Sequence, residues 1–175
     1  MAQRFDLEEP VIDAAINKLR AGLQSRLTAI NTEFADGIPL PVPADSDIYP
    51  FGVTEASAVP LVVVTDGGTG ESMFEEEGPH GLTANYALVV MVCDQDANRE
   101  WLGRKLLRLE RACLEVLYDD PPAEQLVIER PDGTITYPYI KPVRTVPGPV
   151  FNPEQDQTMF RQWRIVLFDV LKSEN

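Results

Sequence analysis

Residues 84–120 read ANYALVVMVCD, QDAN and REWLGRKLLRLERACLEVLYDD, and the fold is decided in this stretch. The run Tyr86–Cys93 is apolar almost without interruption, which is typical of a central strand covered on both faces. After residues 95–98, three of which are polar, apolar residues recur at spacings of three and four from Leu102 onward. This second pattern predicts a long helix that lies on the sheet.

The predicted helix is apolar on two sides. The first side consists of Leu102, Leu106, Leu109, Cys113, Val116 and Leu117. The second side consists of Leu107, Leu114 and Tyr118, and Arg104, Arg108 and Arg111 fill the gap between the two sides. A helix of this kind has to bury both sides, so one lies on the sheet and the other needs a second helix or a neighbouring subunit.

We therefore regard one group of side chains as a candidate subunit interface, namely Arg104, Arg108, Arg111, Leu107, Leu114 and Tyr118. Two interpretations of the arginines stay open. They pair with carboxylates of their own chain and pack through their stems, or they contact an acidic patch of an adjoining subunit. Under the second interpretation, reversing the charges of Arg108 and Arg111 together should weaken association and leave the fold intact.

The totals restrict the class of protein. A chain of 175 residues with 44% hydrophobic residues suits one domain, residues 1–175, with a real core. The net charge of −13 argues against a free nucleic-acid-binding protein, which would normally be basic. The N-terminal residues lack the apolar segment of a signal peptide, and no apolar run is long enough to span a bilayer. We expect a soluble, cytoplasmic protein.

The segments before the central strand predict a helix, a loop and a strand. Residues 6–36 carry one apolar stripe with helical spacing, with Asp6 and Glu9 placed as a capping box. Residues 38–58 contain four prolines and are expected to form an extended loop with at most a short strand. Residues 59–66 predict a buried strand that pairs antiparallel with the central strand across an acidic loop, residues 67–82. Deleting residues 69–79 is expected to leave folding unaffected.

The segments after the second helix complete the sheet. A Pro-Asp-Gly turn predicts a hairpin over residues 126–140. Because prolines cannot donate to a strand ladder, we expect this hairpin to lie at a sheet edge or to project from the sheet. Residues 144–157 are expected to form another proline-rich loop, and residues 158–171 a final strand. The order is α-β-β-α-β-β-β, an α+β domain with a mostly antiparallel sheet and two helices on one face.

No residue pattern predicts catalysis, a cofactor or a metal site. The only histidine, His80, has no nucleophile in a recognisable setting beside it. The glycine-rich stretch 66–72 has Glu71 where a phosphate-binding loop needs lysine, and its neighbouring glutamates are typical of a solvated face. Cys93 and Cys113 are expected to be small core residues. The sequence therefore indicates that the protein is not an enzyme.

The layout of elements resembles that of the tail terminator (tail completion) proteins of tailed bacteriophages. The matching segments are Ile12–Ile30, Pro60–Thr65, Tyr86–Asp94, Arg99–Leu117 and Met159–Leu171. The resemblance implies a structural virion protein that is assembled in the host cytoplasm and forms a hexameric ring capping the tail tube. Its partners would be the tail tube protein and the neck or head connector, and DNA would pass through the lumen without specific binding.

Two alternatives accompany this interpretation. The first is another neck or head–tail adaptor protein, which would bind the connector rather than the tube. The second is a small-ligand or metal-dependent enzyme that uses the acidic loop and Asp94, and it predicts a pocket with convergent polar groups.

Overall fold

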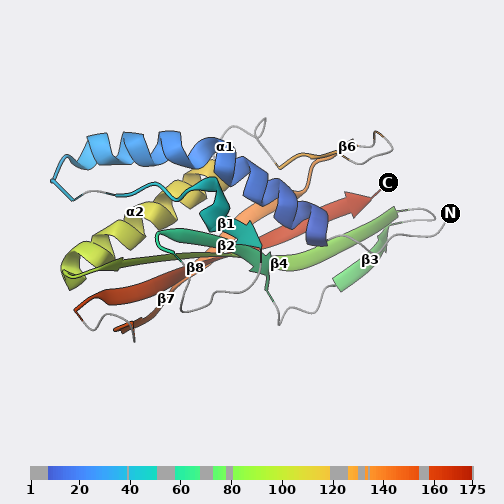
Figure 1. Cartoon of the computed structure of the whole chain (residues 1–175). Helices are drawn as coiled ribbons and strands as arrows, with labels where there is room; N and C mark the ends of the chain where they lie inside the picture. Colours follow the sequence, from blue (N-terminus) through green and yellow to red (C-terminus); the bar gives the residue numbers. More distant parts are fainter. Residues whose placement is uncertain are drawn as a thin grey trace.

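The computed structural model describes residues 8–38, 40–50, 58–67, 73–77, 81–118, 126–129, 133, 135–153 and 158–174, and at 8, 73–77, 81–86 and 171–174 it describes only the backbone. Two helices lie on one face of a twisted sheet (Figure 1). They are α1 (Glu8–Phe34) and α2 (Arg99–Leu117). The predicted fold class is confirmed.

The main sheet has six strands in the order β1-β2-β4-β8-β7, with β3 beside β4. Their bounds are β1 Ile48–Pro50, β2 Leu61–Asp66, β3 Met73–Glu77, β4 Gly81–Asp96, β7 Tyr139–Phe151 and β8 Phe160–Glu174. Every pairing in this sheet is antiparallel except β1 with β2. A separate two-stranded sheet holds β5 (Ile128–Glu129) and β6 (Ile135–Thr136).

The apolar run of the sequence forms the middle of the sheet, as predicted. One edge of β4 pairs with β8 over almost its whole length, and the other edge pairs with β3 and then β2. Val90 and Val92 face the helices and belong to the main core, while Cys93 faces the opposite side and packs with Leu61 and Val63. Both faces of β4 are therefore withdrawn from water near its C-terminal end.

The first helix covers the sheet with one stripe, as its spacing predicts. The buried residues of this stripe are Ile12, Ile16, Leu19, Leu23, Leu27 and Ile30. A Cβ added at Gly22 would lie 3.1–3.2 Å from the methyl groups of Val116 on α2, so the missing side chain permits the close approach of the two helices. Gly37 follows the helix with a φ of +77°, a conformation suited to glycine.

Two strands occupy segments that the sequence predicts as loops. The first, β3, lies in the acidic stretch 67–82, where glutamates disfavour a strand prediction, but its backbone pairs with β4 residues 81–85. Deleting residues 69–79 would remove this strand and expose one edge of β4, so we expect the deletion to affect folding.

The second unpredicted strand is β7, which extends through most of the stretch predicted as a proline-rich loop. Within the described residues it pairs only with β8, and prolines are tolerated on an edge strand because one of its sides lacks a ladder. Register shifts at 142–144 and 147–150 accommodate them. The bulge at Gly148 also makes room for the indole of Trp163, which a Cβ there would meet.

The predicted hairpin at 126–140 is present as β5 and β6, and Gly133 of its turn has a φ of +83°. The two strands form a sheet of their own, and Leu126 and Ile128 anchor it in the main core (Figure 1). The short strand allowed within residues 38–58 is β1. Asp6, Glu71 and His80 lie outside the described residues.

Candidate subunit interface

The inner side of α2 fixes the orientation of the helix. All six residues of the first apolar side are buried, and the helix contacts β4, β8 and α1. Asn98 caps the helix, because its side-chain oxygen accepts hydrogen bonds from the backbone N–H groups of Glu100 (2.9 Å) and Trp101 (3.2 Å). With its start and its inner side fixed, the helix presents one defined surface outward.

The second apolar side of α2 is largely exposed. Leu107 is 52% exposed and Tyr118 is 47% exposed, whereas Leu114 is half-buried against the main core. Trp101, which the apolar pattern of the helix does not single out, is 40% exposed and lies about one turn before Arg104. Its spacing of three residues from Arg104 places the two side chains on the same side of a helix, and this spacing is the signal that could have identified Trp101. We call Trp101, Arg104, Leu107, Arg111, Leu114 and Tyr118 the outer surface of α2.

Arg108 does not belong to that surface, because its side chain is 5% exposed. Nη1 donates to Asp36 Oδ1 at 3.0 Å, Nη2 pairs with Asp36 Oδ2, and the guanidinium lies 4.3 Å from the ring centroid of Phe34. The hydrogen bond from Arg108 lowers the pKa of Asp36. Arg108 thus ties the end of α1 to α2, and reversing its charge would set a carboxylate against Asp36 inside the fold.

The other two arginines remain about half exposed but are held by carboxylates of their own chain. Arg111 donates from both terminal nitrogens to the carboxylate of Glu33, at 3.0 and 2.9 Å, and from Nε to Glu115 at 2.6 Å. Arg104 pairs with Glu100 at 2.9 Å and with Asp36 at 3.9 Å. The hydrogen bond from Arg111 lowers the pKa of Glu33. These pairs match the intramolecular interpretation, and contact with another subunit stays a prediction.

Charged groups also lie beneath the start of α2. Lys105 Nζ is 2.6 Å from Asp96 Oδ2. Burial raises the pKa of Asp94, opposed by the backbone N–H of Gln95, which donates to Oδ1 at 2.8 Å. Asp94 is 2% exposed, and its Oδ2 has no hydrogen-bond partner among the described residues. This carboxylate is therefore buried rather than open to solvent.

The thiols of Cys93 and Cys113 are free and buried. Burial raises the pKa of Cys93 to about 11 and raises that of Cys113 as well. Both are therefore protonated and weakly nucleophilic at neutral pH, as core residues would be. Across the described part of the chain, no three His, Cys, Asp or Glu side chains are grouped to hold a metal ion.

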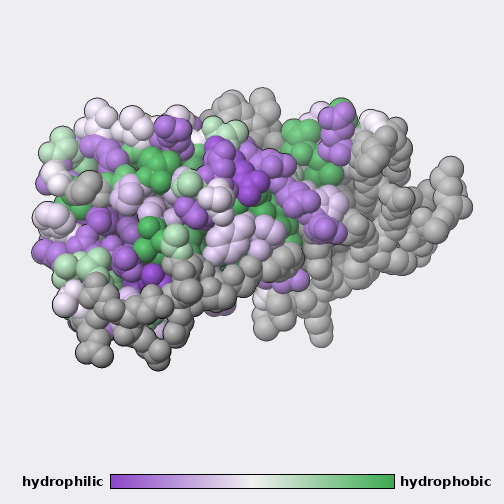
Figure 2. All heavy atoms as spheres, in the orientation of Figure 1, coloured by the Kyte–Doolittle hydropathy of each residue, from purple (hydrophilic) through white to green (hydrophobic). Residues whose placement is uncertain are grey.

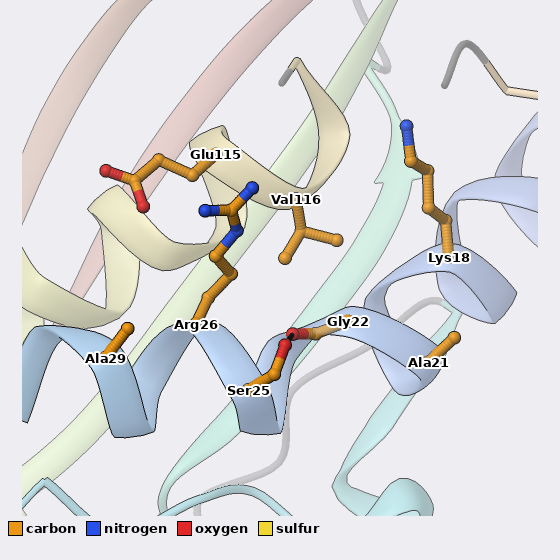
Figure 3. Close-up of a pocket in the computed structure, with 8 residues that line it drawn as sticks. All are labelled: Lys18, Ala21, Gly22, Ser25, Arg26, Ala29, Glu115 and Val116. Atoms are coloured by element: carbon orange, nitrogen blue, oxygen red, sulfur yellow. Dashed lines mark hydrogen bonds between the residues drawn. The ribbon is translucent and has the colours of Figure 1, made fainter. Parts of the chain in front are cut away.

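A pocket of about 420 Å³ opens between α1 and α2 beside the outer surface. Most of the side chains that line it are small, namely Ala21, Gly22, Ser25 and Ala29 of α1 and Val116 of α2. Figure 3 shows Arg26 rising from α1 toward Glu115 and Val116, while Lys18 stands at the other end. We call these eight residues the helix pocket. The sequence does not predict this pocket, since small residues on a helix give no distinctive pattern.

Figure 2 shows hydrophilic and hydrophobic residues intermixed over the coloured part of the surface, in the orientation of Figure 1. Among the described residues, no helix is both long and apolar enough to cross a membrane.

No protein-family model and no curated protein sequence matches this chain. Among solved structures, one similar chain comes from the virion of a native gene transfer agent particle. It shares 13% sequence identity with this chain at a TM-score of 0.39, covering 88% of this chain and 94% of the other.

Proposed function

We propose that this chain is a structural protein of a tailed-phage-type virion, a tail terminator that forms a ring on the end of the tail tube and joins it to the neck or head connector. The proposal starts from the layout of elements described above and depends on one structural observation. That observation is the exposure of the outer surface of α2. Its apolar residues recur at helical spacing, as in a helix side that is buried, but the single chain does not cover them.

The composition of this surface favours a protein partner. Tryptophan, tyrosine and arginine are the residues most enriched at the energetic centres of protein interfaces, and the outer surface holds Trp101, Tyr118 and two arginines. Glu33, Glu100 and Glu115 hold those arginines in place before any partner binds, which lowers the entropy lost on association.

The charge of the chain suits a ring through which DNA moves. With a net charge of −13, copies of this chain would form a lumen whose overall potential repels phosphate. DNA would then pass without being retained by the wall.

The first test is the oligomeric state of the purified protein, measured by sedimentation velocity and native mass spectrometry over a wide range of concentration. We expect a ring of defined subunit number at high concentration or on isolated tail tubes. Binding to tubes would support the terminator, and binding to connectors alone would favour a neck adaptor. A chain that remains monomeric at every concentration and binds neither structure would contradict the proposal.

A matched pair of variants assigns the contact to α2. Leu107→Asp adds a charge to the exposed outer surface and should reduce ring formation. Asn17→Asp adds the same charge to an exposed position of α1 and should leave assembly unchanged. Equal behaviour of the two variants would show that the outer surface is not used.

A further inference from the structure

The face of the sheet that points away from the helices carries apolar side chains of its own. Val166 and Phe168 of β8 belong to the main core beneath the helices. Ile165 and Leu167 alternate with them along the strand and therefore lie on the opposite face. Both are half-buried, and they belong to neither core cluster of the described residues. Figure 1 shows both helices on the other side of the sheet, so in the described part of the chain no helix covers this face.

The edge strand β7 continues this face. In the register of the sheet, Val146 lies beside Ile165, and Arg144 lies beside Leu167. Val146 is 37% exposed, and Arg144 is exposed as well. By contrast, Val63 of β2 is buried on the same face in the smaller core cluster. The face therefore becomes more open toward the β7 edge of the sheet.

The beginning of β7 adds two further residues to this face. Ile140 is buried in the main core, so its neighbours Tyr139 and Lys141 lie on the opposite face. Tyr139 is 47% exposed. We call six residues the open face of the sheet, namely Tyr139, Lys141, Arg144, Val146, Ile165 and Leu167.

The open face is basic, although the chain has a net charge of −13. Lys141 and Arg144 are exposed, and neither forms an ion pair within the described part of the chain. One exposed carboxylate, that of Asp169, lies beside Lys141 in the register. Two cations against one carboxylate leave this region with a positive charge, so its complementary partner is an acidic surface.

The outer surface of α2 has the opposite balance of charge. Its two arginines, Arg104 and Arg111, are bound by three carboxylates, those of Glu33, Glu100 and Glu115. Three carboxylates against two arginines leave one negative charge in excess. The side chain of Glu100 is 72% exposed and that of Glu33 is 54% exposed, so both can meet a cation of another chain.

We propose that the open face of one copy packs against the outer surface of α2 of a second copy. The proposal rests on the proposed ring and names the two surfaces that form its contact. Each surface is apolar with exposed charges, and the excess charges are opposite in sign. The contact would place a helix on the second face of the sheet, which is how α2 already covers the first face within its own chain.

The positions of the two surfaces determine the kind of assembly. The helix α2 packs on β4 and β8 from one side of the sheet, and the open face belongs to β7 and β8 on the other side. When two copies meet in this way, each keeps one surface free for a further copy. Such a contact is heterologous, and it closes into a ring when the rotation allows.

The test starts from a matched pair of full-length variants on β7. Val146→Glu places a carboxylate on the open face, where it would meet the acidic outer surface of the neighbour. Thr145→Glu adds the same charge at the adjacent exposed position, which lies beside Val166 on the opposite face. Val146→Glu should weaken association at least about 30-fold, the effect of losing one hot spot, and Thr145→Glu should associate like the unmodified protein.

Mixing two blocked variants identifies the partner surface. Val146→Glu keeps an intact outer surface of α2, and Leu107→Asp keeps an intact open face. Neither variant alone should form rings, whereas an equal mixture should give a complex of two chains in native mass spectrometry and no full ring. Circular dichroism and thermal unfolding check that each variant is folded.

A third variant tests the role of charge without adding a carboxylate. Lys141→Gln combined with Arg144→Gln changes two exposed residues, so the fold should be retained. Sedimentation velocity should show weaker association than in the unmodified protein and a smaller dependence on salt concentration, because the screened attraction has been removed.

The contrary outcomes are separable. Rings formed by Val146→Glu at the concentration that suffices for the unmodified protein would overturn the docking proposal and leave the ring intact. Equal weakening by Val146→Glu and Thr145→Glu, or a mixture without the two-chain complex, would also overturn it. An unmodified protein that never associates would overturn the proposed function itself.

Discussion

The inner and outer sides of α2 are made of similar residues but have opposite surroundings. Leu109 on the inner side is fully buried, and Leu107, two positions away, is 52% exposed. Both belong to apolar patterns of helical spacing, so the amino-acid types do not distinguish them. What separates them is the presence of a sheet and of α1 on one side only. Periodicity therefore identifies the sides of a helix, and the topology decides which of them the chain itself covers.

The arginines between the two sides make the same point. The sequence pattern does not distinguish Arg104, Arg108 and Arg111. Only Arg108 is buried, and it pairs with Asp36, which lies 72 residues earlier in the chain. Such a partner cannot be inferred from the helix alone. The comparison can be tested by changing each side of the helix separately.

The largest effect is expected from Leu109→Ala on the inner side. The change removes buried methyl groups and leaves a cavity, so it should lower the free energy of unfolding by about 2–5 kcal/mol. Denaturant unfolding monitored by circular dichroism measures the loss. A change no larger than that of a surface substitution would show that the inner side is not packed as described.

A smaller, pH-dependent effect is expected from Asp94→Asn beneath the start of α2. Burial raises the folded-state pKa of this carboxyl, whereas the unfolded chain has the ordinary value of about 3.9. The contribution of the Asp94 carboxyl to the free energy of unfolding is therefore fully present below the unfolded-state pKa. It is lost as the pH rises through the raised folded-state pKa.

Because asparagine stays neutral, Asp94→Asn should raise the free energy of unfolding at neutral pH and have little effect below about pH 4. Unfolding curves across this pH range measure the difference. Asp13→Asn, at an exposed position of α1, serves as the control. Equal stability of Asp94→Asn and unmodified protein at neutral pH would mean that the carboxylate is adequately solvated or paired.

The smallest effect on stability is expected from Leu107→Ala on the outer side. The free energy of unfolding should change by less than about 0.5 kcal/mol, because the side chain is exposed. Self-association, measured by sedimentation velocity, should weaken. If Leu107→Ala destabilised the chain as much as Leu109→Ala, the contrast between the two sides would disappear.

The elements with strong periodicity were predictable from the sequence. The stripe of α1, the apolar run of β4 and the inner side of α2 each contain enough apolar residues to reveal their period. By contrast, the glutamates of β3 and the prolines of β7 mask strands that are held by backbone pairing with β4 and β8. Pairing of this kind depends on a partner distant in sequence, which local patterns do not reveal.

The candidate site was predictable in part. Leu107, Tyr118, Arg104 and Arg111 are exposed on the structure, where a contact could form. Three features became evident only from the packing of the two helices. They are the burial of Arg108, the exposure of Trp101 and the helix pocket. A surface composed from two helices has no signature in either helix alone.

The glycine at position 22 has a consequence for the spacing of the two helices. A Cβ there would press on the methyl groups of Val116, so the valine or the helix that carries it would have to shift by a few tenths of an ångström. Gly22 and Val116 both line the helix pocket, and its width is therefore set by a hydrogen atom where other residues have a carbon.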